Sequence, residues 1–153
     1  MRRHPITKVR CAIKKSNIHG RGTFATTSIR SGTRIVEYTG EIVSATESDY
    51  RANEEPHTWM FDLEDGYFID GNKNMPGPCI NHSCEPNCET EIIDSRVFIR
   101  SSRAIKNSEE LTYDYRFEPD AEIWLCNCGS ERCRGTINLK PRKKRKAAPK
   151  KKR

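Results

Sequence analysis

Short runs in which apolar and polar residues alternate recur along this chain, and a period of two is typical of half-buried β-strands. β-Branched and aromatic residues are frequent in these runs. Glu64-Asp65-Gly66 and Asp94-Ser95 each separate two such runs, as the turn of a hairpin would. The pattern predicts strands over residues 11–13, 34–38, 41–43, 59–63, 67–70, 89–93 and 96–100.

Helix signals are confined to one segment. Ser44 and Glu47 have the spacing of a capping box, which predicts a helix over residues 45–52. Residues 71–88 hold two glycines and three prolines, so we expect a largely irregular path there. Many short strands with one short helix indicate a mainly β fold.

The length of 153 residues favours a single domain. Hydrophobic residues make up only 34% of the chain, but much of the deficit lies at the C-terminus, so the body can still bury a core. No run of about 18 apolar residues occurs, so we expect no membrane span and no membrane partner. Met1-Arg2-Arg3 is basic without an apolar stretch behind it, so we expect no conventional secretory signal.

Basic residues are concentrated at the C-terminus. Ten of the 28 lysines and arginines lie in residues 140–153, which contain no acidic residue. The other 139 residues therefore carry 18 basic and 21 acidic side chains, a net charge of −3, which suits binding of a cationic peptide. We expect the tail to be disordered. It fits a solvated charge run, a nuclear localisation signal, non-specific contact with nucleic acid, or self-methylation of its lysines.

Seven cysteines in a chain without a secretion signal argue against a disulfide scaffold and favour metal binding. Three of them lie within eight residues and can wrap one ion: Cys126, Cys128 and Cys133. A structural zinc site needs a fourth ligand, for which Cys84 and Cys88 are the candidates. Cys11 and Cys79 fit small buried hydrophobic positions better.

Other segments join residue types that suit binding. Asn81 and His82 offer amide and imidazole groups for an amino-acid-like and purine-like ligand, although the same residues also suit a polar turn. Leu111, Tyr113 and Tyr115 share one face if extended, which by itself fits an edge strand with a packed aromatic face.

The segment His19-Gly20-Arg21-Gly22 predicts a glycine turn between strands. Together with Ala25 it also fits the loose dinucleotide-binding fingerprint. The residues that follow are β-branched and leave no room for a crossover helix, so we reject a βαβ unit.

Three motifs, in this order, resemble SET-domain protein lysine methyltransferases with a post-SET zinc motif and a trithorax-like core. They are Asn81-His82-Ser83-Cys84, Glu109-Glu110-Leu111-Thr112-Tyr113-Asp114-Tyr115 and Cys126-x-Cys128-x4-Cys133. The resemblance covers roughly residues 9–138, and no counterpart of the zinc-rich domain that precedes SET in some relatives is found. It implies a β-clip of short antiparallel sheets with a C-terminal pseudoknot, followed by a small zinc knot. It also implies that a methyl group passes from S-adenosylmethionine to the ε-amine of a lysine in a protein.

The resemblance further implies roles for single residues. Cys84 is implied as the ligand that completes one structural zinc site with Cys126, Cys128 and Cys133. The residues implied at the S-adenosylmethionine site are His19, Arg21, Gly22, Trp59, Asn81, His82 and Asn127.

The two tyrosines are implied to lie at the reacting amine, with Tyr115 as the catalytic tyrosine and Tyr113 as the position that sets the number of methyl groups. A tyrosine hydroxyl can hold the amine or a water and takes up volume that phenylalanine would leave free. We therefore expect mainly mono-methylation.

Two departures from the family pattern change the surroundings of the site. Gly77-Pro78-Cys79-Ile80 stands where the family usually has Ala-Arg-Phe-Ile, so an arginine and a phenylalanine are lost. Trp59 stands where the family often has tyrosine, which keeps an aromatic wall but adds bulk and moves the donor. We expect a narrower or differently shaped substrate channel.

The predicted organisation is a flexible N-terminus over residues 1–8, a SET domain over 9–117, a post-SET zinc-binding segment over 118–139 and a disordered basic tail over 140–153. The expected substrate is a lysine-containing basic protein, such as a histone or histone-like protein. The expected location is the nucleus or chromosome of a eukaryote, or the cytoplasm or nucleoid of a bacterium. Two alternatives are a SET-like peptide-binding module of weak activity and a zinc-stabilised nucleic-acid-binding protein.

Overall fold

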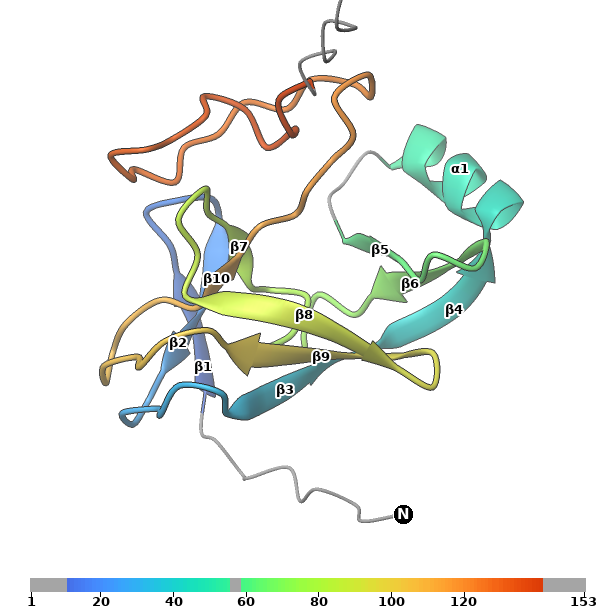
Figure 1. The fold of residues 1–153 in the computed structure, drawn as a ribbon. Coiled ribbons are helices and arrows are strands. Elements are labelled where there is room, and N and C mark those ends of the chain that lie inside the picture. Colours follow the sequence, from blue (N-terminus) through green and yellow to red (C-terminus); the bar gives the residue numbers. More distant parts are fainter. Residues whose placement is uncertain (1–10, 56–58, 142–153) are drawn as a thin grey trace, which may run out of the picture.

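The computed structural model describes residues 11–55 and 59–141 (Figure 1). The predictions for residues 1–8 and for nearly all of the basic tail lie outside these described residues. Ten short strands and one helix make up the regular structure of the described part, so the predicted mainly β fold is confirmed. That helix is not long and apolar enough to cross a membrane.

The strands form four small sheets. β6 lies between β4 and β5, β9 lies between β3 and β8, and β1 pairs with β2, all in antiparallel fashion. β7 and β10 form a parallel pair. In chain order the elements are β1 (Cys11–Lys15), β2 (Arg21–Ala25), β3 (Arg34–Tyr38), β4 (Gly40–Ser44), α1 (Ala45–Glu54), β5 (Met60–Asp62), β6 (Tyr67–Gly71), β7 (Asn81–His82), β8 (Cys88–Ile93), β9 (Arg96–Ser101) and β10 (Thr112–Tyr113).

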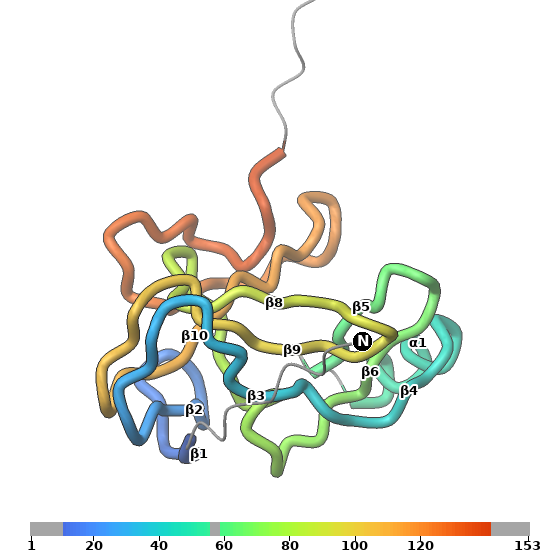
Figure 2. The backbone as a smooth tube through the Cα atoms, turned by 60° about the horizontal axis from the view of Figure 1, so that its bottom comes forward, coloured from blue at the N-terminus to red at the C-terminus, as the bar shows by residue number. Residues whose placement is uncertain are grey.

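The C-terminal part of the described chain lies on one side of these sheets. Figures 1 and 2 show it in orange and red, over β7 and β10 and outside every named strand. Isolated bridges between Phe117 and Asn138 and between Leu125 and Thr136 fold it back on itself. We call residues 118–139 the cap.

Both predicted hairpins are confirmed, and their turns have the backbone shape that the sequence suggests. Asp94 and Ser95 join β8 to β9 with φ angles of 50° and 57°. Two successive left-handed residues match the right-handed twist of paired strands, and aspartate tolerates this region well. Gly66, with φ of 85°, closes the turn between β5 and β6.

The helix α1 begins where the capping signal predicts. The Ser44 side chain accepts a hydrogen bond from the backbone N–H of Glu47. Arg51 then ties the helix to the sheet beneath it, because its guanidinium donates to Glu41 of β4 at 2.9 Å and to Asp70 of β6 at 2.7 Å.

The main core lies between the small sheets and joins residues that are distant in sequence. Ile35, Ile80, Ile99 and Leu111 are almost fully inaccessible to solvent and pack in one cluster. Tyr113 belongs to this cluster and Tyr115 packs against it, so the core directly supports the tyrosine segment.

The parallel pair of β7 and β10 brings two of the sequence motifs side by side. Asn81 lies opposite Thr112, and His82 lies opposite Tyr113. The 29 residues between β7 and β10 run through the β8–β9 hairpin before returning, so the chain passes next to its own earlier path. The close approach of the two motifs that the resemblance implies is thereby confirmed.

Candidate active site and cysteine cluster

A pocket lies between the sheets and the cap, and segments from four parts of the chain contribute to it. His19 comes from the β1–β2 turn, Asn81 from β7, Tyr115 from the residue run after β10, and Asn127 from the cap. Its full lining is Ile18, His19, Asn81, His82, Tyr115, Trp124, Leu125, Cys126, Asn127 and Ile137.

Three hydrogen bonds from its side-chain amide nitrogen hold Asn81 in one orientation. Its Nδ2 donates to the carbonyl oxygens of His19 (3.1 Å) and Arg21 (3.0 Å) and to Oε1 of Glu110 (2.9 Å). Its Oδ1 accepts no hydrogen bond from another described side chain or backbone group, so it is available to a bound donor. A Cβ at Gly22 would overlap the Glu110 carboxylate, which explains the glycine there.

His82 links the tyrosine segment to the cysteines. The backbone N–H of Tyr115 donates to its Nδ1 at 3.1 Å, and its Nε2 lies 3.4 Å from the sulfur of Cys84. Burial lowers the pKa of His82 to about 4, against the opposing influence of the Asp114 charge. The ring is therefore neutral near pH 7, as an accepting Nδ1 requires.

Tyr113 and Tyr115 lie in contact, with ring centroids 4.8 Å apart. The Tyr115 hydroxyl donates to the carbonyl oxygen of Ile80 at 2.7 Å, whereas no hydrogen bond joins the Tyr113 hydroxyl to another described residue. Burial raises the pKa of each tyrosine above its usual value, so both hydroxyls stay protonated. The rings belong to a row that runs from the core to the cap through Tyr38, Phe61, Tyr113, Tyr115, Phe117 and Trp124.

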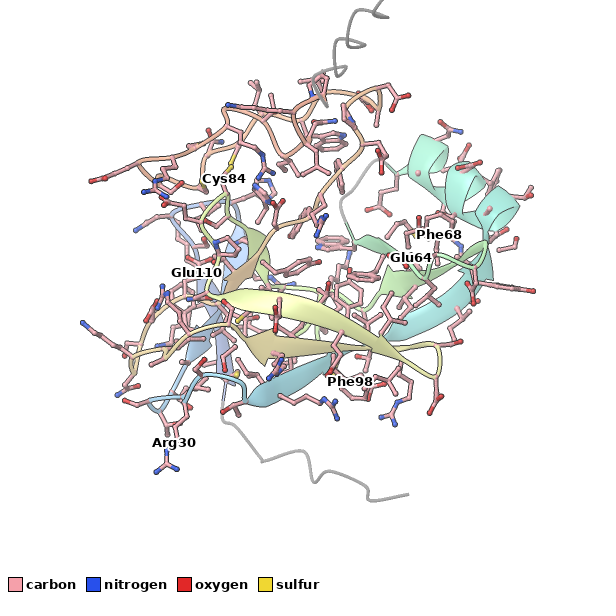
Figure 3. All side chains as sticks on the ribbon, viewed as in Figure 1. Arg30, Glu64, Phe68, Cys84, Phe98 and Glu110 are labelled. Carbon is pink, nitrogen blue, oxygen red and sulfur yellow. The ribbon has the colours of Figure 1, made fainter. Side chains whose placement is uncertain are left out.

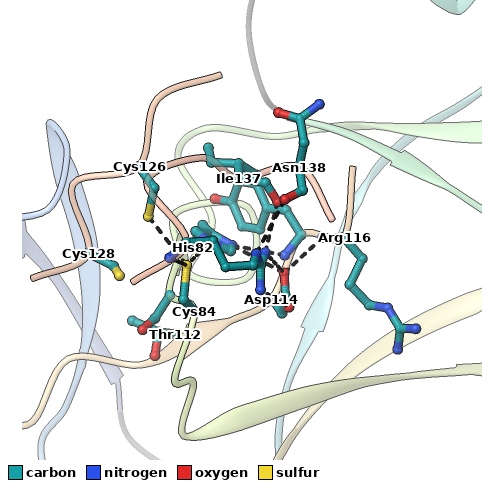
Figure 4. A network of polar contacts seen from close by, with 12 residues as sticks. His82, Cys84, Thr112, Asp114, Arg116, Cys126, Cys128, Ile137 and Asn138 are labelled. Carbon is teal, nitrogen blue, oxygen red and sulfur yellow. Dashed lines mark hydrogen bonds and ion pairs between the residues drawn. The ribbon is translucent and has the colours of Figure 1, made fainter. Parts of the chain in front are cut away.

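Four cysteine sulfurs gather at the base of the cap, all within 4.8 Å of one another: Cys84, Cys126, Cys128 and Cys133. Cys84 lies between the sheets and the cap (Figure 3) and points towards Cys126 at 3.8 Å (Figure 4). Zinc–sulfur bonds of about 2.3 Å in a tetrahedron separate the sulfurs by about 3.8 Å, so this donor set fits a zinc ion. Cys88, the alternative fourth ligand, instead lies in the core, where its sulfur donates to Asn87.

The cap is tied to the tyrosine segment by an ion pair. Arg134 donates through Nη1 and Nη2 to the two carboxylate oxygens of Asp114, each at 2.8 Å. Within the cap, Asn138 is almost fully buried and donates to the carbonyl oxygens of Glu118 and Glu122, both at 3.0 Å. Its Oδ1 accepts the backbone N–H of Trp124 at 3.1 Å, which sets the position of that pocket residue.

The structure brings His19, Asn81, His82, Asn127 and Tyr115 to one pocket but places four other predicted site residues elsewhere. Gly22 lies behind Asn81, and Tyr113 is buried beside Tyr115. The Arg21 guanidinium donates to the carbonyl oxygen of Lys73 at 2.6 Å. Trp59 lines a separate hollow, where the Lys73 ammonium lies 5.7 Å from its ring.

Sequence reasoning missed three apolar residues of the pocket wall, Ile18, Trp124 and Ile137, whereas the resemblance already implied that a zinc ion pins the segment from Leu125 to Cys133 over the cofactor. Leu125 is 79% exposed, which is unusual for a leucine and marks a wall that a ligand would cover. The apolar run Ile123-Trp124-Leu125, directly before Cys126, was the available signal.

The first departure from the family pattern, Gly77-Pro78-Cys79-Ile80, is accommodated by close packing. Cys79 is buried, and its sulfur donates to the carbonyl oxygen of Lys73 at 3.1 Å. Pro78 packs on Gly71, where a Cβ would come within 2.9 Å of the proline ring.

Comparison with known proteins gives one family and a set of long relatives. Residues 20–116 match the SET domain. The chain is 38% identical over 133 residues to the histone-lysine N-methyltransferase trithorax of Drosophila virilis, covering 81% of this chain and 4% of that protein. It is 40% identical over 140 residues to histone-lysine N-methyltransferase ATX2 of Arabidopsis thaliana, covering 84% and 13%. It is 36% identical over 143 residues to histone-lysine N-methyltransferase 2B of Homo sapiens, covering 86% and 5%. The chain thus spans only a small part of the length of these relatives.

Proposed function

Because this chain belongs to the family of SET-domain proteins, we propose that it transfers a methyl group from S-adenosylmethionine to the ε-amine of a lysine in a protein. The observation that carries the proposal is one pocket in which Asn81, His82 and Tyr115 meet beside four clustered cysteines. The names of the relatives support a histone or histone-like basic protein as substrate. An enzyme with a histone substrate would act on chromatin, and in a eukaryote it would therefore be located in the nucleus.

The pocket residues suit the methyl donor. S-adenosylmethionine supplies a methyl group on a sulfonium, which is already a strong electrophile, so the protein has to bind, orient and desolvate. The open Oδ1 of Asn81 suits the ammonium of an amino-acid end, with His19 beside it. The backbone of His82 and the side-chain amide of Asn127 suit a purine, and Trp124 supplies an aromatic wall.

The tyrosines suit a neutral amine. A free lysine has a pKa of about 10.4 and is mostly protonated in water, but a dry channel beside a cationic group favours the neutral form. Tyr115 lines the pocket, and the buried ring of Tyr113 and the partly buried ring of Phe61 exclude water behind it. After the lysine ammonium has lost one proton to solvent, its nitrogen would form a bond to the methyl carbon while the bond from that carbon to the sulfonium sulfur breaks. S-adenosylhomocysteine would leave as a neutral thioether, and the methylated amine would carry the positive charge.

The unpaired hydroxyl of Tyr113 supports mono-methylation. It can accept an N–H of the substrate amine, and it fills space that a second methyl group would need. One relative, ATX1 of Arabidopsis thaliana, is named a histone H3-lysine(4) N-trimethyltransferase, so the product has to be measured on this chain.

The four cysteines are proposed to hold one structural zinc ion. Cys84 belongs to the body and the other three belong to the cap, so a shared ion would pin the cap over the pocket. That role is structural, because all four coordination positions are taken by protein thiolates.

The test is a methyl-transfer assay with labelled S-adenosylmethionine, purified histones and a whole-cell extract of basic proteins, followed by mass spectrometry of the labelled residues. We expect label on lysine, mainly as monomethyl-lysine, and a shift to di- and trimethyl-lysine with Tyr113→Phe. Tyr67→Phe is the matched control, since Tyr67 is 52% exposed on β6. Binding of basic peptides without any transfer would identify a peptide-binding module instead, and an unchanged product distribution in Tyr113→Phe would refute the role of Tyr113.

A further inference from the structure

We propose that Arg134 is a positioning residue, whose ion pair with Asp114 holds the cap over the pocket independently of the cysteine cluster. The inference rests on the proposed function only for its effect on methyl transfer. Its effect on the order of the cap is a property of the fold and is measured without any substrate.

The contacts of Arg134 form one fork across two segments. Both carboxylate oxygens of Asp114 accept from it at 2.8 Å, and the carbonyl oxygen of Ile137 accepts from Nη2 at 2.9 Å. The carbonyl oxygen of Asn138 accepts from Nε at 3.3 Å. A planar guanidinium can satisfy such a set at once, whereas an ammonium is a point charge and cannot.

This pair is better shielded than a surface ion pair. The side chains of Arg134 and Asp114 are only 16% and 22% exposed. Exposed pairs contribute little because water screens them, and shielding with bidentate geometry makes the pair stronger. Loss of one partner also leaves the other charge half-buried without compensation.

The position of Asp114 in the sequence explains how this ion pair can affect the pocket. Asp114 lies between Tyr113 and Tyr115, and it also accepts the backbone N–H of Arg116 at 3.0 Å. On the cap side, Arg134 donates a hydrogen bond to the backbone carbonyl oxygen of Ile137, a residue that lines the pocket. One ion pair therefore fixes the pocket wall relative to the tyrosine segment.

A neighbouring pair offers a matched control. Among the described residues, two ion pairs join the cap to the body, and the second is Arg132 with Glu85. Its atoms are 3.7 Å apart and the Arg132 side chain is 86% exposed, so its contribution is small. The two arginines flank Cys133 in sequence, so both substitutions lie next to a cluster cysteine. Arg134→Gln removes the hydrogen bonds to Ile137 and Asn138 as well as the ion pair, whereas the backbone N–H that Arg134 donates to the Cys84 sulfur stays in place.

The test compares Arg134→Gln, Arg134→Lys and Arg132→Gln in the zinc-loaded protein. We expect Arg134→Gln to speed amide hydrogen exchange in residues 118–139 and to raise KM for S-adenosylmethionine about tenfold, which corresponds to about 1.4 kcal/mol at 25 °C. Zinc content, exchange in the sheets and kcat should change little. Arg134→Lys should fall between, because lysine keeps the charge but not the fork, and Arg132→Gln should match the unsubstituted chain.

The proposal is overturned if Arg134→Gln and Arg132→Gln give the same exchange and the same KM while both retain zinc. If Arg134→Gln loses zinc, the ion pair is tested instead with Asp114→Asn, which removes the partner in the body. A normal KM together with normal amide hydrogen exchange in the cap of that variant also overturns the proposal. If the unsubstituted chain methylates nothing, the proposed function fails, and hydrogen exchange in the cap still decides the role of Arg134.

Discussion

Removal of the Asn87 side chain should destabilise this fold more than removal of any exposed amide. Asn87 is 2% exposed and contacts the tyrosine segment through three hydrogen bonds. Its Nδ2 donates to the carbonyl oxygen of Glu110 at 2.8 Å and to the Glu109 carboxylate at 3.1 Å, and its Oδ1 accepts the backbone N–H of Thr112 at 2.9 Å. Asn87→Ala removes all three.

The size of the effect follows from these contacts. Each hydrogen bond contributes about 1 kcal/mol net, and the buried N–H of Thr112 would be left without a partner, so we expect a loss of about 3 kcal/mol. With a urea m-value of about 2 kcal/mol/M, the unfolding midpoint should fall by about 1.5 M. Asn87→Asp keeps the acceptor for Thr112 but turns both donors into acceptors, so it should destabilise the protein by a similar amount.

The assay is urea unfolding of the zinc-loaded protein, followed by tryptophan fluorescence. Asn74→Ala is the control, because Asn74 is exposed in the loop before β7. A midpoint for Asn87→Ala within about 0.3 M of the unsubstituted protein would show that these contacts do not hold the segment.

Two further predictions concern titratable groups. Burial would raise the pKa of Glu109, but hydrogen bonds led by the Arg103 guanidinium hold it below its usual value, so its stabilising effect is present above about pH 4.5 and is lost as pH falls through the lowered pKa. Unfolding measured from pH 3 to 6 should therefore depend less steeply on pH in Glu109→Gln, and equal slopes would contradict this. Burial also raises the pKa of Cys88 to about 12 and that of Cys11 to about 11, so both should react slowly with iodoacetamide at pH 8 with or without a chelator. A strong chelator should add labelling at the four clustered cysteines, because a bound ion would no longer shield their sulfurs, and should abolish methyl transfer. Full activity with chelator, or fast labelling of Cys88, would count against these assignments.

The features that the sequence predicted are those set by neighbouring residues. The capping box at Ser44 and the turn at Asp94-Ser95 act within a few residues, so local pattern identifies them. The strands follow for the same reason, since alternation of apolar and polar residues needs no knowledge of the partner strand.

The choice between Cys84 and Cys88 could not be made from sequence alone. Both follow Asn81 closely, and either spacing can reach the three cap cysteines. Cys88 is the first residue of β8, and the pairing of β8 with β9 directs its side chain into the core, whereas Cys84 lies in the loop that meets the cap. The register of the sheet therefore determines which cysteine can reach the cap, and the spacing of the cysteines in the sequence does not reveal that register.

The buried amides were missed for a related reason. Asn87 and Asn138 lie in stretches that read as polar loops, and nothing nearby marks them as buried. Their partners are 14 to 25 residues away and, apart from Thr112 in β10, lie outside every named strand and helix. Only the folded chain shows that these side chains replace backbone pairing.

That replacement explains how two irregular segments can carry a precise site. β10 has only two residues, so a sheet holds Tyr113 but not Tyr115. The backbone of this segment is held instead by side chains from three directions: Asn87 binds the N–H of Thr112, His82 binds the N–H of Tyr115, and Arg134 binds the carboxylate between the tyrosines. Side-chain anchors need no continuous partner strand, so the chain can pass its own earlier path and still leave both tyrosines fixed. A longer strand would pair more residues, but it would occupy the side of the segment where the cap and the pocket now lie.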